Sequence, residues 1–324
     1  MSILTSAAAL VAGAVLALSA VGVAPAPEPS GAGALIENYI TENKIKPTQL
    51  ALGYLNTVTG EEYYVNRDTN FYGASLYKVA LNMYYAERVA GGEMEWTTKV
   101  RGTALEILMA GSLEQSNNNY SYKLYQALGA YRASKLKCAY LYGLTEEEAR
   151  ADRQFWTDSY ITPWRMITCL NTLYTEPERF PTVIDHLLLA QPGRYFRLKE
   201  DRWEIAQKYG YLGQFGRDVS TAGIVYAPEP FELVVLTHNL PHAEEHIAAI
   251  CVLLGDYISG QTLEEAHAAA AAAAREEAEA AAAEEAARAE AAAELSLEEA
   301  PAEETPAPEE AAQTDAPEET PDAA

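Results

Sequence analysis

The pattern of apolar and polar positions begins with a short helix and a β-hairpin. Residues 34–43 carry apolar side chains at helical spacing, whereas residues 49–56 and 61–65 alternate apolar with small or polar residues on either side of a Thr-Gly turn. These patterns predict a helix followed by two antiparallel strands. A loop over residues 66–73 then leads from the hairpin into the next apolar segment.

A long helical region follows the hairpin, and strand patterns return only after it. Apolar residues recur at spacings of three and four near residues 75–89, 103–112, 119–131, 145–154, 163–174 and 181–189. Aromatic and β-branched residues then dominate residues 203–211, 219–227 and 231–237, and an apolar helix is predicted over 242–258. This order predicts an α/β (α+β) fold.

In this predicted fold, a five-stranded antiparallel sheet is flanked by the terminal helices on one face. The helical insert, about residues 75–190, separates strands two and three and covers the other face. A cleft between the sheet and the insert is then the natural place for a site.

The N-terminus is apolar and has no charge before Glu28. The run from Ala7 to Ala24 has the length of a signal h-region or a short membrane span. No Lys or Arg precedes it, so either the true start lies upstream or the segment is an uncleaved anchor; a buried core helix is the alternative. We therefore expect residues 1–24 to be a signal peptide or membrane anchor and residues 25–33 a linker. The body, residues 34–260, is then extracytoplasmic.

The C-terminal residues carry most of the charge. The chain of 324 residues has a net charge of -24, and residues 264–324, with 19 acidic and 2 basic residues, contribute -17, which leaves -7 for the rest. We expect residues 261–324 to form an acidic low-complexity tail, helical and solvated over 266–294 and disordered over 296–324. A spacer or solubilising role is favoured over partner binding. The body has no basic stripe, which argues against nucleic acid.

The cysteines and histidines do not form a recognisable framework. Cys138, Cys169 and Cys251 are widely spaced in apolar surroundings, which favours small buried side chains with at most one bridge. His238, His242 and His246 are spaced by four and could provide two metal ligands, but Pro241 interrupts the helix and no patterned carboxylate completes a site. We predict no metal and no cofactor.

The strongest candidate for chemistry is Ser75-Leu76-Tyr77-Lys78, where a turn ends and an apolar helix begins. A spacing of three places the serine and the lysine on one helical face, where a partly desolvated amine can activate the hydroxyl as a nucleophile. The helix start also favours developing negative charge. A second copy, Ser134 with Lys137, has no turn before it, and we interpret it as a solvated helix face.

Two further motifs follow in order, each present once. Ser116-Asn117-Asn118 lies 41 residues after Ser75, and Lys208-Tyr209-Gly210 lies 92 residues after Ser116, on a predicted strand. A helix cap, an exposed strand lysine and a bulge are the structural alternatives for these residues. In this order the three motifs resemble the SxxK, SxN and KxG set of penicillin-binding proteins and class A β-lactamases. The resemblance covers about residues 34–258.

The resemblance implies a role for each residue. Ser75 is the nucleophile, and Lys78 takes its proton, with a pKa held down by burial and by Lys208. Ser116 relays a proton to the departing nitrogen, and Lys208 supplies positive potential for a substrate carboxylate and orients Ser116. Three residues are then substrate-binding: Asn118 holds the substrate amide, Gly210 leaves room for it, and the backbone N–H of Tyr211 joins that of Ser75 in the oxyanion hole.

Two departures from the family pattern stand out. Tyr209 replaces the Thr or Ser whose hydroxyl helps to bind the substrate carboxylate, and Ser220 or Thr221 is a possible substitute. The family's deacylating glutamate has no clear counterpart. Residues 146–148 are glutamates at about the right distance from Pro163, with an acidic first helical turn as the alternative.

We therefore expect an exported, monomeric serine hydrolase that forms an acyl-enzyme on Ser75. Its partner would be a small-molecule β-lactam or a peptidoglycan stem peptide ending in a D-alanyl-D-alanine-type amide. The alternatives are a D-Ala-D-Ala peptidase or penicillin-binding protein with slow deacylation, a catalytically silent peptidoglycan-binding member, and a spacer protein whose function lies in the tail.

Overall fold

The computed structural model describes residues 31–213 and 217–298, which divide into two compact units between Leu263 and Glu264. The expected signal or anchor segment and most of the linker lie outside these residues. Within the described ranges, no helix is both long enough and apolar enough to span a membrane.

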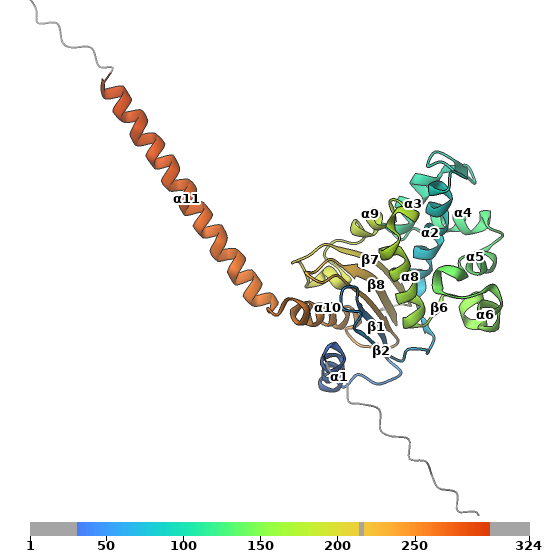
Figure 1. Ribbon diagram of the computed structural model, residues 1–324. Coiled ribbons are helices and arrows are strands. Elements are labelled where there is room, and N and C mark those ends of the chain that lie inside the picture. Colours follow the sequence, from blue (N-terminus) through green and yellow to red (C-terminus); the bar gives the residue numbers. More distant parts are fainter. Residues whose placement is uncertain (1–30, 214–216, 299–324) are drawn as a thin grey trace, which may run out of the picture. The chain divides into compact units, whose positions relative to one another are not determined.

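The first unit is built on a five-stranded antiparallel sheet with the order β2-β1-β9-β8-β7 (Figure 1). Its strands are β1 (Leu50–Asn56), β2 (Glu62–Val65), β7 (Ile205–Leu212), β8 (Asp218–Val225) and β9 (Phe231–Thr237). β1 and β2 form the predicted hairpin, and the three later strands follow each other in the chain. The central strand β9 pairs with both groups and so joins the two halves of the sheet. The predicted fold class is confirmed.

The insert between β2 and β7 is mainly helical. Its helices are η1 (Ala74–Leu76), α2 (Tyr77–Ala90), α3 (Leu105–Leu113), α4 (Asn118–Ala127), α5 (Tyr131–Lys137), η2 (Ala139–Tyr142), α6 (Glu146–Ala151), α7 (Arg153–Thr157), α8 (Pro163–Thr175), η3 (Pro177–Arg179), α9 (Val183–Leu188) and η4 (Tyr195–Leu198). It also contains two small sheets, β3 (Phe71–Tyr72) with β6 (Tyr160–Ile161) and β4 (Lys99–Val100) with β5 (Thr103–Ala104).

Local sequence signals set the ends of several of these helices. Pro163 is the first residue of α8, where its missing N–H costs nothing. Thr145 and Glu148 form a reciprocal capping box at the start of α6. At the other end of the unit, Gly260 adopts a left-handed conformation (φ 65°) directly after α10 (Ala243–Ser259) and ends that helix.

The sheet separates two hydrophobic cores. One core contains the insert helices, with α8 across β1 and β9, and the other contains α1 (Ala32–Glu42) and α10. Along β9 the side chains alternate between them: Leu233 and Val235 belong to the terminal-helix core, whereas Val234 and Leu236 belong to the insert core. Because both faces are covered, every residue of β9 is buried. The prediction placed the terminal helices on one face of the sheet and the insert on the other, and the structure shows this arrangement.

The second unit begins at Glu264 and contains all but the first residue of α11 (Leu263–Glu298). Its residues 268–289 are exposed, in accord with a helix of Ala, Glu and Arg that has no apolar stripe. Residues 299–324, for which disorder is predicted, lie outside the described part of the chain.

Candidate active site

Ser75 lies in the one-turn helix η1 that leads into α2, and several contacts fix the backbone before it. The Gly73 N–H donates to Ser159 O (2.8 Å), and the Ser220 hydroxyl donates to Tyr72 O (3.0 Å). Ala74 has a positive φ of 47°, a conformation that L-residues adopt at some cost. Ser75 is held, partly exposed, at the end of this constrained turn.

Lys78, one turn after Ser75, is completely buried in α2. Its Nζ donates three hydrogen bonds, to Ser116 O (2.6 Å), Ser116 Oγ (3.2 Å) and Asn118 Oδ1 (2.8 Å). The first two predicted motifs therefore meet at this amine.

The Ser116–Asn118 segment performs two tasks. Asn117 caps α4, because its Oδ1 accepts from the N–H groups of Asn119 (2.9 Å) and Tyr120 (3.4 Å). The flanking Ser116 and Asn118 turn to Lys78 instead, and Ser116 has a positive φ of 54°. The helix cap proposed as the structural alternative thus exists at Asn117, alongside the contacts to the lysine.

The third motif lies on the edge strand β7, next to the turn that carries Ser75. A Cβ added to Gly210 would lie 2.6 Å from Ser75 N and 2.8 Å from Gly73 O, so only glycine allows the strand to approach this turn. Gly210 pairs with Ser220 in regular register, so it is not a bulge. Lys208 is completely buried and not an exposed strand lysine. Tyr211 follows Gly210, with its side chain 64% exposed.

Tyr209 fills the position between Lys208 and Gly210 in a fixed conformation. Its ring stacks on Tyr195 (centroids 4.8 Å apart, planes at 18°), and its hydroxyl accepts from Gln191 Nε2 (2.9 Å). Burial raises the pKa of the phenol, and side-chain hydrogen bonding from Gln191 and Ser116 partly lowers it.

The two buried amines differ in their surroundings. Burial lowers the pKa of Lys78 to about 8. Burial, and next the charge of Lys78, lower the pKa of Lys208 well below its usual value. Lys78 has three acceptors, whereas Lys208 Nζ donates to Tyr209 O (3.1 Å), its single acceptor among the described residues. A proton shared by this pair is therefore more stable on Lys78, and the pKa of Lys78 is held down by burial and not by a charge on Lys208.

Two of the three glutamates considered for deacylation are engaged in other contacts, and all three are exposed. Glu148 accepts from Thr145 N and Oγ1 (both 2.8 Å) in the capping box of α6, and Glu146 forms an ion pair with Arg150 (2.5 Å). Residues 146–148 are exposed in the first turn of α6. The structure thus agrees with the alternative interpretation, an acidic helix start.

The second SxxK copy differs from the prediction of a solvated face. Ser134 is 2% and Lys135 3% exposed, although Lys137 is exposed. Lys135 Nζ lies 4.0 Å from the centroid of the Phe155 ring, and burial lowers its pKa to about 7. The prediction holds for Lys137 and is wrong for Ser134 and Lys135, because aromatic residues of α7 and η2 cover that side of α5. Ser134 Oγ donates to Tyr131 O (2.7 Å).

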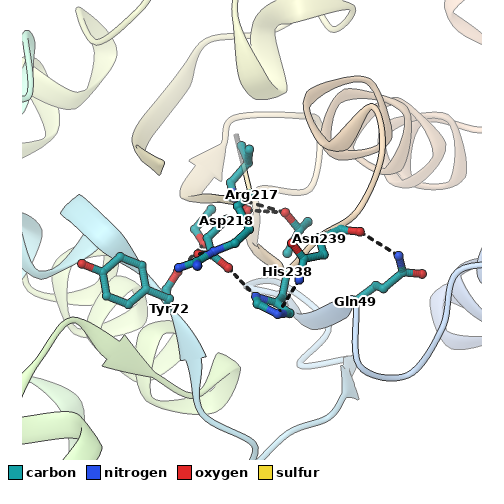
Figure 2. Close-up of polar contacts among 9 residues, drawn as sticks. Gln49, Tyr72, Arg217, Asp218, His238 and Asn239 are labelled. Carbon is teal, nitrogen blue, oxygen red and sulfur yellow. Dashed lines mark hydrogen bonds and ion pairs between the residues drawn. The ribbon is translucent and has the colours of Figure 1, made fainter. Parts of the chain in front are cut away.

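A polar cluster lies behind Tyr72, at the start of β8 (Figure 2). Asp218, which is 1% exposed, accepts from His238 Nδ1 (2.6 Å) and from Arg217 Nε (3.0 Å). A pocket of about 440 Å³ adjoins it, and none of the predicted site residues lines this pocket. His246 pairs instead with Tyr39 (2.8 Å). Within the described ranges, no group of three His, Cys, Asp or Glu side chains is placed to hold a metal ion.

The three cysteines are buried and unpaired, as interpreted from their apolar surroundings. Three other features of the site could not be read from the sequence. They are the strained Ala74, the stacking partner Tyr195 and the Gln191 contact to Tyr209. None lies in a motif, and alanine gives no signal for a positive φ.

Comparisons with known proteins identify the family and the fold of this chain. A model described as the Beta-lactamase enzyme family matches residues 34–132 and 103–258. The fold is similar to that of the TLA-3 extended-spectrum beta-lactamase, with 16% identity, a TM-score of 0.59, and coverage of 70% of this chain and 99% of that chain. The fold is also similar to that of the TLA-1 extended spectrum beta-lactamase, with 17% identity, a TM-score of 0.60, and coverage of 70% of this chain and 99% of that chain.

A class A beta-lactamase of the last common ancestor of Gram-negative bacteria has a similar fold, with 18% identity, a TM-score of 0.56, and coverage of 68% of this chain and 98% of that chain. No curated protein matches this chain. The family match spans more than half of the chain and includes all three motifs. The chain therefore belongs to the beta-lactamase enzyme family, and it is a serine hydrolase with the class A fold.

Proposed function

We propose that Ser75 forms an acyl-enzyme with a β-lactam or with a D-alanyl-D-alanine-type amide. The observation that carries the proposal is the convergence of three distant segments: Lys78 contacts Ser116 and Asn118, and Gly210 touches the backbone of Ser75. A lone SxxK has no such support, as the second copy illustrates.

In the proposed reaction Ser75 Oγ bonds to the carbonyl carbon, and its proton passes to Lys78 Nζ. The C–N bond of the substrate then breaks, and the proton reaches the leaving nitrogen through Ser116 Oγ, to which Lys78 already donates. The backbone N–H groups of Ser75 and Tyr211 would stabilise the oxyanion. The low pKa of Lys78, about 8, supports its use as a base near neutral pH.

Slow release of the acyl group is the second candidate, as in a penicillin-binding protein. The specific observation is that residues 146–148 form the exposed, capped start of α6. General-base help is worth about 10² to 10⁴ in rate, so without a glutamate that activates water the acyl-enzyme would persist. In that case the site binds the acyl group covalently on Ser75 and releases it slowly.

The experiment is incubation of the full chain with a labelled penicillin, followed by intact mass spectrometry and peptide mapping. We expect one adduct on Ser75, none in Ser75→Ala, and an unchanged adduct in Ser134→Ala. Absence of the adduct in the wild type would contradict the enzyme proposal. The lifetime of the adduct on Ser75 distinguishes two cases. An enzyme that turns over loses the adduct within seconds, whereas a stable acyl-enzyme keeps it for hours.

We further propose that the domain acts as a monomer outside the cytoplasmic membrane, exported or anchored through residues 1–24. The support is the uncharged apolar run of these residues. Cell fractionation with and without residues 1–24 tests the localisation.

A further inference from the structure

This inference rests on the proposed function and concerns the part of the substrate next to the scissile bond. A substrate carboxylate there would need a cation or free hydroxyl donors along β7 and β8. The residues that could provide this cation or these hydroxyls are Lys208, Ser220 and Thr221. The structure gives the burial of each and the hydrogen bonds of Lys208 and Ser220.

Lys208 is not available to a ligand. Its side chain is completely buried, its Nζ donates to Tyr209 O, and Nζ lies 4.0 Å from the centroid of the Tyr209 ring. The neighbouring Lys78 amine, with its three acceptors, is the better place for the pair's positive charge.

Tyr209 is a fixed cover and not a mobile one. Its side chain is 5% exposed, its ring stacks on Tyr195, and its hydroxyl is anchored by Gln191. Moving the ring away would break the stack and the hydrogen bond together. A substrate carboxylate therefore cannot reach Lys208 without opening this arrangement.

The hydroxyls considered as substitutes do not compensate. Ser220 is completely buried and donates its hydroxyl to Tyr72 O (3.0 Å), where it holds the strand before the nucleophile. Thr221 is also completely buried, and its hydroxyl has no hydrogen-bond partner among the described residues. Neither hydroxyl is exposed to a bound anion.

We propose that this site gains little from a carboxylate next to the scissile bond. Its substrates are acyl compounds, amides or esters, whose recognition does not depend on such a carboxylate. Tyr209 is the specificity-determining residue, because it closes the position over Lys208. The bonding changes are those of the proposed function, with the leaving nitrogen or oxygen taking the proton.

The test compares benzylpenicillin with its methyl ester, using the full chain and acylation rates from intact mass. We expect the two rates to differ by less than about threefold in the wild type. A usable charge-assisted hydrogen bond would instead make the acid about tenfold faster or more. An acid preference of that size in the wild type overturns the inference and leaves the proposed function standing.

Tyr209→Thr should open the position over Lys208 and shift the ratio about tenfold toward the acid, whereas Tyr209→Phe, which keeps the ring, should leave the ratio unchanged. A folded Tyr209→Thr protein with the wild-type ratio also overturns the inference. The wild-type ratio needs no variant, so misfolding of a variant does not remove the test. No adduct with either compound overturns the proposed function, and this inference with it.

Discussion

Replacing Gly210 by Ala is the sharpest perturbation of the candidate site. The added methyl would lie 2.6 Å from Ser75 N, 2.8 Å from Ala74 Cβ and 2.8 Å from Gly73 O. Favourable contacts of carbon atoms begin near 3.5 Å, so β7 and the turn that carries Ser75 must separate by about 1 Å. Two of the three contacts are backbone atoms that no rotamer change can move.

The separation should remove the proposed oxyanion hole, whose donors lie on the two segments that are pushed apart. Loss of one such donor costs about 2.7 to 4 kcal/mol, or 10² to 10³ in rate. We expect Gly210→Ala to acylate with labelled penicillin at least about 100-fold more slowly, in a time course followed by intact mass.

The matched control is Gly53→Ala in β1. Its added methyl would lie at a similarly short distance, 2.8 Å, from the side-chain atom Ile167 Cγ1, but β9 and β8 separate β1 from β7. Both variants should lower Tm, and only Gly210→Ala should lose acylation. Acylation by Gly210→Ala within threefold of the wild type, or equal losses in both variants, would refute the reasoning.

Three further predictions concern buried charges. Acylation should rise with pH through about 8, because only the neutral Lys78 amine accepts a proton; a flat profile from pH 6 to 10 contradicts this. Within the described part of the chain the Glu232 carboxyl group has no hydrogen-bond partner, and burial raises its pKa to about 9, so stability should fall as pH rises from 4.5 to 9. In urea unfolding, Glu232→Gln should flatten this slope and stabilise at pH 7 by up to about 3 kcal/mol. Burial lowers the pKa of Lys135 to about 7, so the effect of this lysine on the pH dependence of stability has the opposite sign. The free energy of unfolding should rise from pH 7 to 10.5. Lys135→Met should stabilise the protein at pH 7 by up to about 4 kcal/mol. Unchanged unfolding free energies would contradict the last two.

The SxN segment shows how a short motif serves fold and chemistry together. Asn117 satisfies the free N–H groups at the start of α4, which fixes the backbone of its two neighbours. Ser116 and Asn118 are then held at Lys78. An exchange of Asn117 should therefore affect both helix stability and the lysine's contacts.

The sequence by itself determined the elements and their order. Apolar periodicity, the Thr-Gly hairpin turn and Pro163 at the first position of α8 are local signals, and local physics is enough to read them. The antiparallel sheet with its insert followed from that order. Three short motifs also indicated which residues to examine as the site.

Only the tertiary structure decided what surrounds those residues. Whether a residue is solvated depends on side chains elsewhere in the chain, so the solvated face predicted from Ser134 and Lys137 is in part buried: aromatic rings of α7 and η2 cover the intervening Lys135. The same holds for Lys208, whose burial and cover by Tyr209 depend on Tyr195 and Gln191. Burial and close approach are properties of packed surfaces, and no spacing along a single segment encodes them.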